Sequence, residues 1–119
     1  AERLLDLIGA SAPIALYAKD TDGRYLYANQ VVADATGTRP GELVGKTDFH
    51  WAPPEIAAEL AANDVEAITS GGLKDTLEII QHPGGEERTY RALKSPLRDR
   101  SGQVIGLVGV STDITEQKR

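Results

Sequence analysis

Residues 104–110 read Val-Ile-Gly-Leu-Val-Gly-Val, an apolar stretch in which hydrophobic and polar side chains do not alternate. A strand with this pattern is expected to be buried on both faces. A chain of 119 residues encloses one core, and an antiparallel sheet buries only one face on that core. The other face therefore needs a second cover, and the terminal helices of the chain or a partner subunit are the candidates.

Turn sequences divide the surrounding apolar runs into strands. His82-Pro83-Gly84-Gly85 and Asp99-Arg100-Ser101-Gly102 are predicted turns. They separate three predicted strands, at residues 73–81, 88–97 and 103–114. Near the start of the chain, the runs 14–19 and 24–28 flank an Asp-Gly turn and predict a β-hairpin.

Helices are predicted between the hairpin and the three strands. Asn29 caps a short helix that ends at Gly37, and a second helical turn is predicted at residues 40–43. Residues 53–70 form the one long helix, with prolines at its start and Gly71-Gly72 after its end. Its 3.6-residue periodicity gives an apolar face made of Ile56, Leu60, Ala61, Val65 and Ile68. The order predicts an α+β domain with a five-stranded antiparallel sheet.

Composition excludes several classes of function. The formal net charge is −5 without a local lysine and arginine cluster, which argues against binding nucleic acid. The chain has no cysteine, so disulfides, thiolate metal sites and cysteine nucleophiles are excluded. No apolar run approaches the roughly 20 residues of a membrane span, and no direct membrane contact is expected. The sequence shows no Ser/His/Asp arrangement, phosphate-binding loop or cluster of metal ligands, so we expect neither catalytic activity nor a metal.

Four local signatures, in this order, carry a family resemblance. They are Asp22-Gly23-Arg24 with Tyr27-Ala28-Asn29, Gly45-Lys46-Thr47-Asp48, Ser95-Pro96-Leu97-Arg98-Asp99 with Gly102 and residues 104–106, and Asp113-Ile114-Thr115. Together they resemble the Per-Arnt-Sim (PAS) sensory domain from about Ile14 to Thr115. The resemblance implies a cupped sheet whose inner face is closed by helices to form a pocket.

The resemblance also implies a regulatory role. Such domains belong to histidine kinases, diguanylate cyclases and transcriptional regulators, and they dimerise through helices on the outer sheet face. We therefore expect a cytoplasmic sensor or dimerisation module excised from a longer protein. Its parts are a flanking helix at residues 1–12, the PAS domain at 13–115, and at 116–119 the start of a helical linker to an effector. A homodimer is predicted through residues 2–8 and the outer face around Val108 and Val110.

The resemblance bears on cofactors as well. Light-oxygen-voltage relatives need a cysteine for their flavin adduct, and this chain has none. Haem-sensing relatives use a histidine on or near the long helix, whereas here His50 precedes that helix and His82 lies in a turn. No cofactor is expected. A sensor with non-covalent flavin or haem remains the alternative.

Strand alternation selects candidate pocket residues. Tyr90, Ala92 and Lys94 share one face, which analogy with ligand-bearing relatives makes the inner one. Hairpin pairing puts Thr76, Glu78 and Ile80 on the same face, with Glu78 diagonal to Lys94, and Ser111 and Gly109 also face inward. Lys94, Tyr90 and Ser111 would hold a small polar ligand that carries a carboxylate or a hydroxyl. The alternative, which we favour, is that Glu78 or Asp48 neutralises Lys94 in a closed core without a ligand.

Two further pairs of residues are notable. Phe49 and Trp51 would stack on a planar ligand or fill the core, and we favour the core. Asp113 and Thr115 lie where the last strand meets the exit helix. We expect them to cap that helix and, through the cap, to couple the sheet to the linker.

Overall fold

The computed structural model describes residues 14–118. Strands β1 (Ile14–Asp20) and β2 (Tyr25–Ala28) are followed by α2 (Gln30–Thr36), the 3-10 helix η1 (Asp48–His50) and α3 (Pro54–Ser70). Strands β3 (Lys74–Gln81), β4 (Glu87–Arg98) and β5 (Val104–Asp113) come next, and α4 (Thr115–Lys118) follows them. The predicted helix at residues 1–12 lies outside the described residues.

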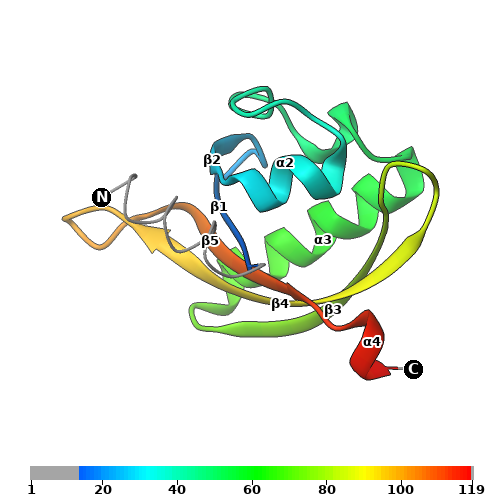
Figure 1. Cartoon of the computed structure of the whole chain (residues 1–119). Helices are drawn as coiled ribbons and strands as arrows, with labels where there is room; N and C mark the ends of the chain where they lie inside the picture. The colour runs from blue at the N-terminus through cyan, green and yellow to red at the C-terminus, as the bar shows by residue number, and fades with distance from the viewer. Residues whose placement is uncertain (1–13, 119) are drawn as a thin grey trace.

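The five strands form one antiparallel sheet in the order β2-β1-β5-β4-β3. Helices α2 and α3 lie on one side of the sheet, and α4 continues from the end of β5 (Figure 1). The predicted α+β fold with helices over one face of a five-stranded sheet is confirmed. Central strand β5 pairs with both β1 and β4, so residues from the two ends of the chain meet on one inner face.

The two faces of β5 differ, although its sequence does not alternate. Leu107, Gly109 and Ser111 are buried on the inner face. Val108 and Val110 lie on the outer face and stay 40% and 39% exposed. The expectation of burial on both faces is therefore not met by the described part of the chain, in which the outer face is only partly covered.

The buried face of helix α3 overlaps only in part with the predicted one. Its buried residues are Ala57, Leu60, Asp64 and Ala67, whereas Val65 is 57% exposed. Of the five predicted positions, Leu60 is buried, Ile56 and Ile68 are half-buried, and Ala61 and Val65 are exposed. The prediction was wrong in part because it chose the face from apolar residues alone, whereas the charged side chain of Asp64 lies on the buried face.

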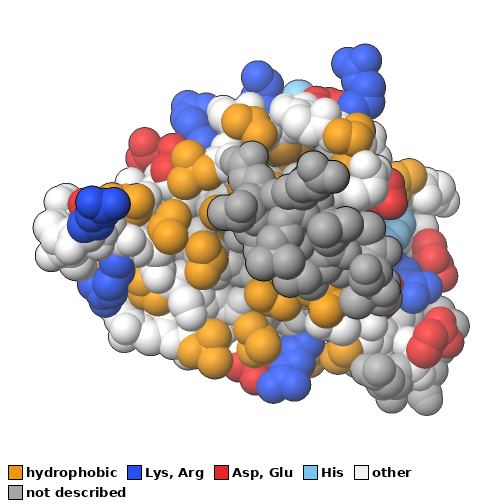
Figure 2. All heavy atoms as spheres, turned by 60° about the vertical axis from the view of Figure 1, so that its left-hand side comes forward, with side chains coloured by type: hydrophobic (Ala, Val, Ile, Leu, Met, Phe, Trp, Pro, Cys, Tyr) orange, Lys and Arg blue, Asp and Glu red, His pale blue; other side chains and the backbone are white. Residues whose placement is uncertain are grey.

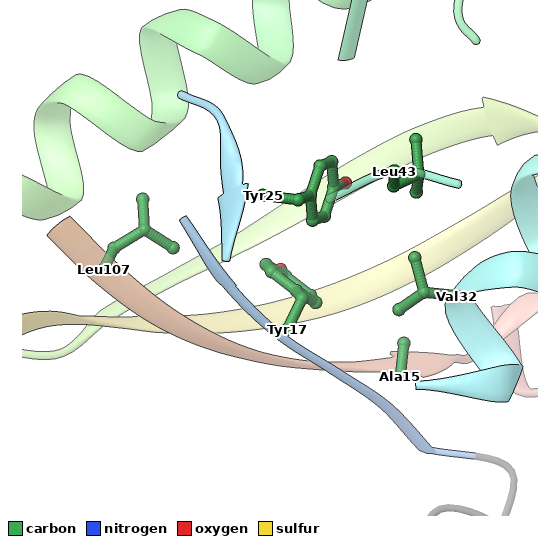
Figure 3. Packing of buried hydrophobic residues seen from close by; sticks show 6 residues of the cluster. All are labelled: Ala15, Tyr17, Tyr25, Val32, Leu43 and Leu107. Carbon is green, nitrogen blue, oxygen red and sulfur yellow. The ribbon is translucent and has the colours of Figure 1, made fainter. Parts of the chain in front are cut away.

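The hydrophobic core lies between the inner sheet face and the helices. Figure 3 shows side chains of β1, β2, α2 and β5 that point toward one another; the cluster comprises Ala15, Tyr17, Tyr25, Val32, Leu43 and Leu107. Helix α2 is fixed at both ends. The Asn29 side chain accepts a hydrogen bond from the Val32 amide, and Gly37 ends the helix in the left-handed region. Residues 40–43 form turns and not a further helix.

Candidate functional site

A cavity of about 60 Å³ lies between the inner sheet face and the helices. All five residues predicted to contact a ligand line it: Asp48, Glu78, Tyr90, Lys94 and Ser111. Strands β3, β4 and β5 supply four of them, and Asp48 begins η1. The alternation of inward-facing positions therefore located this wall of the cavity correctly.

Lys94 is almost completely buried, with 1% of its side chain exposed. Its Nζ lies 2.5 Å from Oε2 of Glu78 and 2.7 Å from Oδ1 of Asp64. Glu78 stands directly opposite Tyr90 in the β3–β4 register, and Lys94 stands opposite Lys74. The predicted ion pair between Lys94 and Glu78 is confirmed. Lys94 lies four residues along β4 from Tyr90, the direct partner of Glu78, whereas the predicted diagonal arrangement places it two residues away.

A second buried lysine extends this pair into a larger cluster. Lys19 of β1 donates from Nζ to Oδ2 of Asp48 at 2.6 Å and to Oδ2 of Asp64 at 2.7 Å. We call the five linked residues the ion chain; in order they are Asp48, Lys19, Asp64, Lys94 and Glu78. Asp48 therefore neutralises Lys19 and not Lys94.

The ion chain shifts the pKa of Lys19 and of Asp48. Burial lowers the pKa of Lys19, but the carboxylates of Asp48 and Asp64 outweigh burial and hold that pKa above its ordinary value. Burial likewise raises the pKa of Asp48, and Lys19 with the hydrogen bonds of Tyr25 and Trp51 brings it below its ordinary value. In residues 14–118 every buried side-chain nitrogen and oxygen has a hydrogen-bond partner. Desolvation of these charges is thus offset by complete pairing.

Tyr17 of β1 lines the cavity and contacts β5. Its hydroxyl lies 2.8 Å from Oγ of Ser111, and its ring occupies the space that a Cβ at Gly109 would need. Gly109 faces inward as predicted, and the Tyr17 ring fills the space beside it. Burial, and then the charge of Glu78, raise the pKa of Tyr17 well above its ordinary value.

Tyr90 connects the cavity to the turn between β3 and β4. Its hydroxyl lies 2.6 Å from Nε2 of His82, and the two rings stack with their centroids 5.8 Å apart. Burial, with a contribution from Asp113, raises the pKa of Tyr90 to about 12. In the β4–β5 register Tyr90 is the direct partner of Asp113, so a cavity residue is the neighbour of the exit junction.

The exit junction consists of Asp113, Thr115 and two residues of β4. Oδ1 of Asp113 accepts hydrogen bonds from the amide and the hydroxyl of Thr115, while Oδ2 accepts from Nε of Arg88 at 2.7 Å. Oγ1 of Thr115 accepts from the amide of Thr89. The predicted cap at the start of the exit helix is present, and the same two side chains tie that helix to β4.

The comparisons with known proteins identify the family. A family model described as the PAS fold matches residues 10–119. The chain belongs to the PAS family. This PAS chain is 34% identical to a diguanylate cyclase of Vibrio cholerae over 95% of its own length and 36% of the relative's. It is 31% identical to the methanogenesis regulatory histidine kinase FilI of Methanothrix harundinacea over 87% of its length and 12% of the relative's. It thus spans about a third or less of these curated relatives.

Solved structures agree with this assignment. VqmA of Vibrio cholerae has a TM-score of 0.84 and 27% identity to this PAS chain, covering 98% of it and 52% of VqmA. A structure of VqmA bound to DPO matches with a TM-score of 0.82 at 27% identity, over 95% of this chain and 57% of that one. Histidine kinases and a cyclase among the relatives make the PAS chain a sensory signalling module.

Several features of this PAS site were not found from the sequence. Lys19, Asp64 and Tyr17 were missed, although Lys19 and Tyr17 continue the alternation of Ala15 in β1. Phe49 was expected in the core but is 57% exposed, while Trp51 packs against the core and donates to Asp48. His50 lies at the surface, 2.9 Å from Glu42.

Two properties of residues 14–118 bear on membranes and metals. None of the helices there is both long enough and apolar enough to cross a membrane. No group of three or more histidine, aspartate or glutamate side chains there could hold a metal ion.

Proposed function

We propose that this PAS domain is a non-catalytic sensor and dimerisation module in a longer cytoplasmic signalling protein. It passes ligand occupancy or conformation to an effector such as a histidine kinase or diguanylate cyclase. The observation that carries this proposal is the β4–β5 register, in which Tyr90 of the cavity wall is paired with Asp113 of the exit junction. A change at the cavity therefore has a direct route to the start of α4.

Cavity size supports a small ligand over a bound flavin or haem. Pockets that hold drug-sized molecules are about 300–1,000 Å³, whereas this cavity is about 60 Å³. VqmA, which is similar in structure to this PAS chain, was solved bound to DPO. An absorbance spectrum of the freshly purified chain tests the choice, because a visible band would favour the flavin or haem alternative.

The outer sheet face supports a homodimer. Exposed apolar side chains on the outer sheet face include Leu77, Ile79, Val108 and Val110. In the view of Figure 2, hydrophobic side chains group together on the surface. The predicted contribution of residues 2–8 lies outside the described residues. Sedimentation at high micromolar concentration tests this assembly, and a strictly monomeric profile would count against it. The net charge of −5 argues against direct contact with nucleic acid.

Filling the cavity tests ligand sensing. Ala35 of α2 lines the cavity and is 5% exposed, so Ala35→Leu places three extra carbon atoms there without removing a polar group. In the full-length parent we expect the effector output to stop responding to stimulus, at a stability cost of about 1–3 kcal/mol. Ala58→Leu makes the same change at an exposed position of α3 and is the control. Normal regulation in Ala35→Leu would argue against a sensing role for the cavity.

Removing the cap tests the coupling. Asp113→Ala leaves the amide and hydroxyl of Thr115 and Nε of Arg88 without this acceptor, while Nη1 of Arg88 still donates to Glu86. We expect the isolated chain to remain folded and to lose about 0.5–2 kcal/mol, as for a lost helix cap. The parent's output should nevertheless be locked high or low. Unchanged output with and without stimulus would reduce Asp113 to an ordinary cap.

A further inference from the structure

The charged lining of the cavity restricts the kind of molecule that it can hold. We propose that its ligand is an uncharged small molecule with both a hydrogen-bond donor and an acceptor, such as a small amide or alcohol. The ion chain excludes carboxylates and other anions. This inference rests on the proposed function of ligand sensing and names the ligand class of the same site.

The sign of the charge comes from the composition of the ion chain. Lys19, Asp48, Glu78 and Lys94 line the cavity, and Asp64 joins the two lysines. Three carboxylates and two ammonium groups give a formal charge of −1. An entering anion would lose its hydration shell and meet a site of its own sign, with little water to screen the repulsion.

The two lysines are also already engaged. Each ammonium has three N–H donors, and each lysine donates to two carboxylates. The Lys19 ammonium additionally lies 4.8 Å from the centre of the Tyr25 ring. An anion that took two hydrogen bonds from either lysine would displace a carboxylate, which would then be buried without its partner.

An uncharged molecule meets neither obstacle. The third N–H of Lys94 suits a carbonyl or hydroxyl oxygen, and no carboxylate has to move. The Tyr17 and Ser111 hydroxyls adapt to a donor or an acceptor, since either can donate in their mutual hydrogen bond. Val32 and Leu60 supply apolar wall. One water-sized group needs about 10–15 Å³, so a cavity of about 60 Å³ suits a molecule of a few non-hydrogen atoms.

Three probes of matched size test the inference: propionamide, propionate and propylammonium. Each is titrated into the ¹⁵N-labelled 119-residue chain while backbone amide signals are followed. We expect propionamide to shift the signals of cavity residues such as Ser111, and propionate to bind at least about tenfold more weakly.

The other outcomes of the titrations overturn either the exclusion of anions or ligand sensing itself. Propionate binding as tightly as propionamide overturns anion exclusion and leaves ligand sensing standing. Propylammonium binding about tenfold more tightly than propionamide makes the ligand a cation and also overturns the inference. If no probe shifts the cavity signals, ligand sensing itself fails, and the inference fails with it.

A pair of variants assigns the selectivity to the ion chain. Glu78→Gln removes one negative charge from the cavity, and we expect propionate to gain about tenfold in affinity relative to propionamide. Asp75→Asn changes a carboxylate of the same strand whose side chain lies on the outer face, and it should leave the ratio unchanged. A folded Glu78→Gln protein with the wild-type ratio would show that the ion chain does not select the ligand. Should Glu78→Gln not fold, the wild-type ratio decides alone.

Discussion

Strands β3 and β4 are joined by an ion pair on each face of the sheet. The two pairs have similar distances between their charged atoms but differ in their exposure to solvent. On the inner face, Lys94 and Glu78 lie 2.5 Å apart with side chains 1% and 9% exposed. On the outer face, Arg91 and Asp75 lie 2.6 Å apart with side chains 55% and 48% exposed. Geometry alone therefore does not set the energetic role of an ion pair, because water screens the outer pair and not the inner one.

The largest expected effect is that of breaking the inner pair. Lys94→Met leaves Glu78 and one oxygen of Asp64 buried without their cation. We expect a loss of about 3–5 kcal/mol in the free energy of unfolding, measured with urea. The double variant Lys94→Met/Glu78→Gln should recover part of the loss, because Asp64 still has Lys19. A single variant as stable as wild type would mean that Lys94 is solvated and not buried.

Alkaline pH should weaken the inner face alone. The pKa of Lys19 is raised above its ordinary 10.5, because Asp48 and Asp64 outweigh burial, and burial raises that of Tyr17 above its ordinary 10.0. Both groups hold their protons more tightly when folded. Their contribution to stability is therefore complete below about pH 10 and is lost as the pH rises further.

The measurement is the free energy of unfolding between pH 8 and pH 12. We expect it to fall above about pH 10, and to fall less steeply in Tyr17→Phe, which removes one of the groups whose pKa is raised in the folded state. Arg91→Met is the control on the outer face and should follow the wild-type slope. A flat alkaline profile in the wild type would contradict the assigned pKa directions.

The sequence predicted the inward-facing positions of the strands better than the buried face of helix α3. In β3 and β4 a period of two fixes which side chain faces inward, so Glu78, Tyr90 and Lys94 were found. In α3 the 3.6-residue period of the apolar residues did not locate the whole buried face, because that period takes no account of charged residues and Asp64 lies on the buried face. A buried charge is stable only with its partners, and those partners come from β1 and β4. Their approach is a property of the tertiary structure, which one helix does not reveal.

The smallest expected effect is that of breaking the outer pair. Arg91 donates to Asp75 through Nε and one terminal nitrogen, and the pair is open to solvent on the outer face. Arg91→Met should shift the urea midpoint by only a small fraction of the Lys94→Met shift, because both charges remain hydrated when separated. In 1 M NaCl, where the screening length is roughly 3 Å, the remaining difference from wild type should vanish, whereas the Lys94→Met effect should persist. Arg91→Met could instead lose as much stability as Lys94→Met, with no sensitivity to salt. That result would mean that a partner buries the outer pair. Sedimentation of the same variant would then show whether the partner is a second copy of the chain.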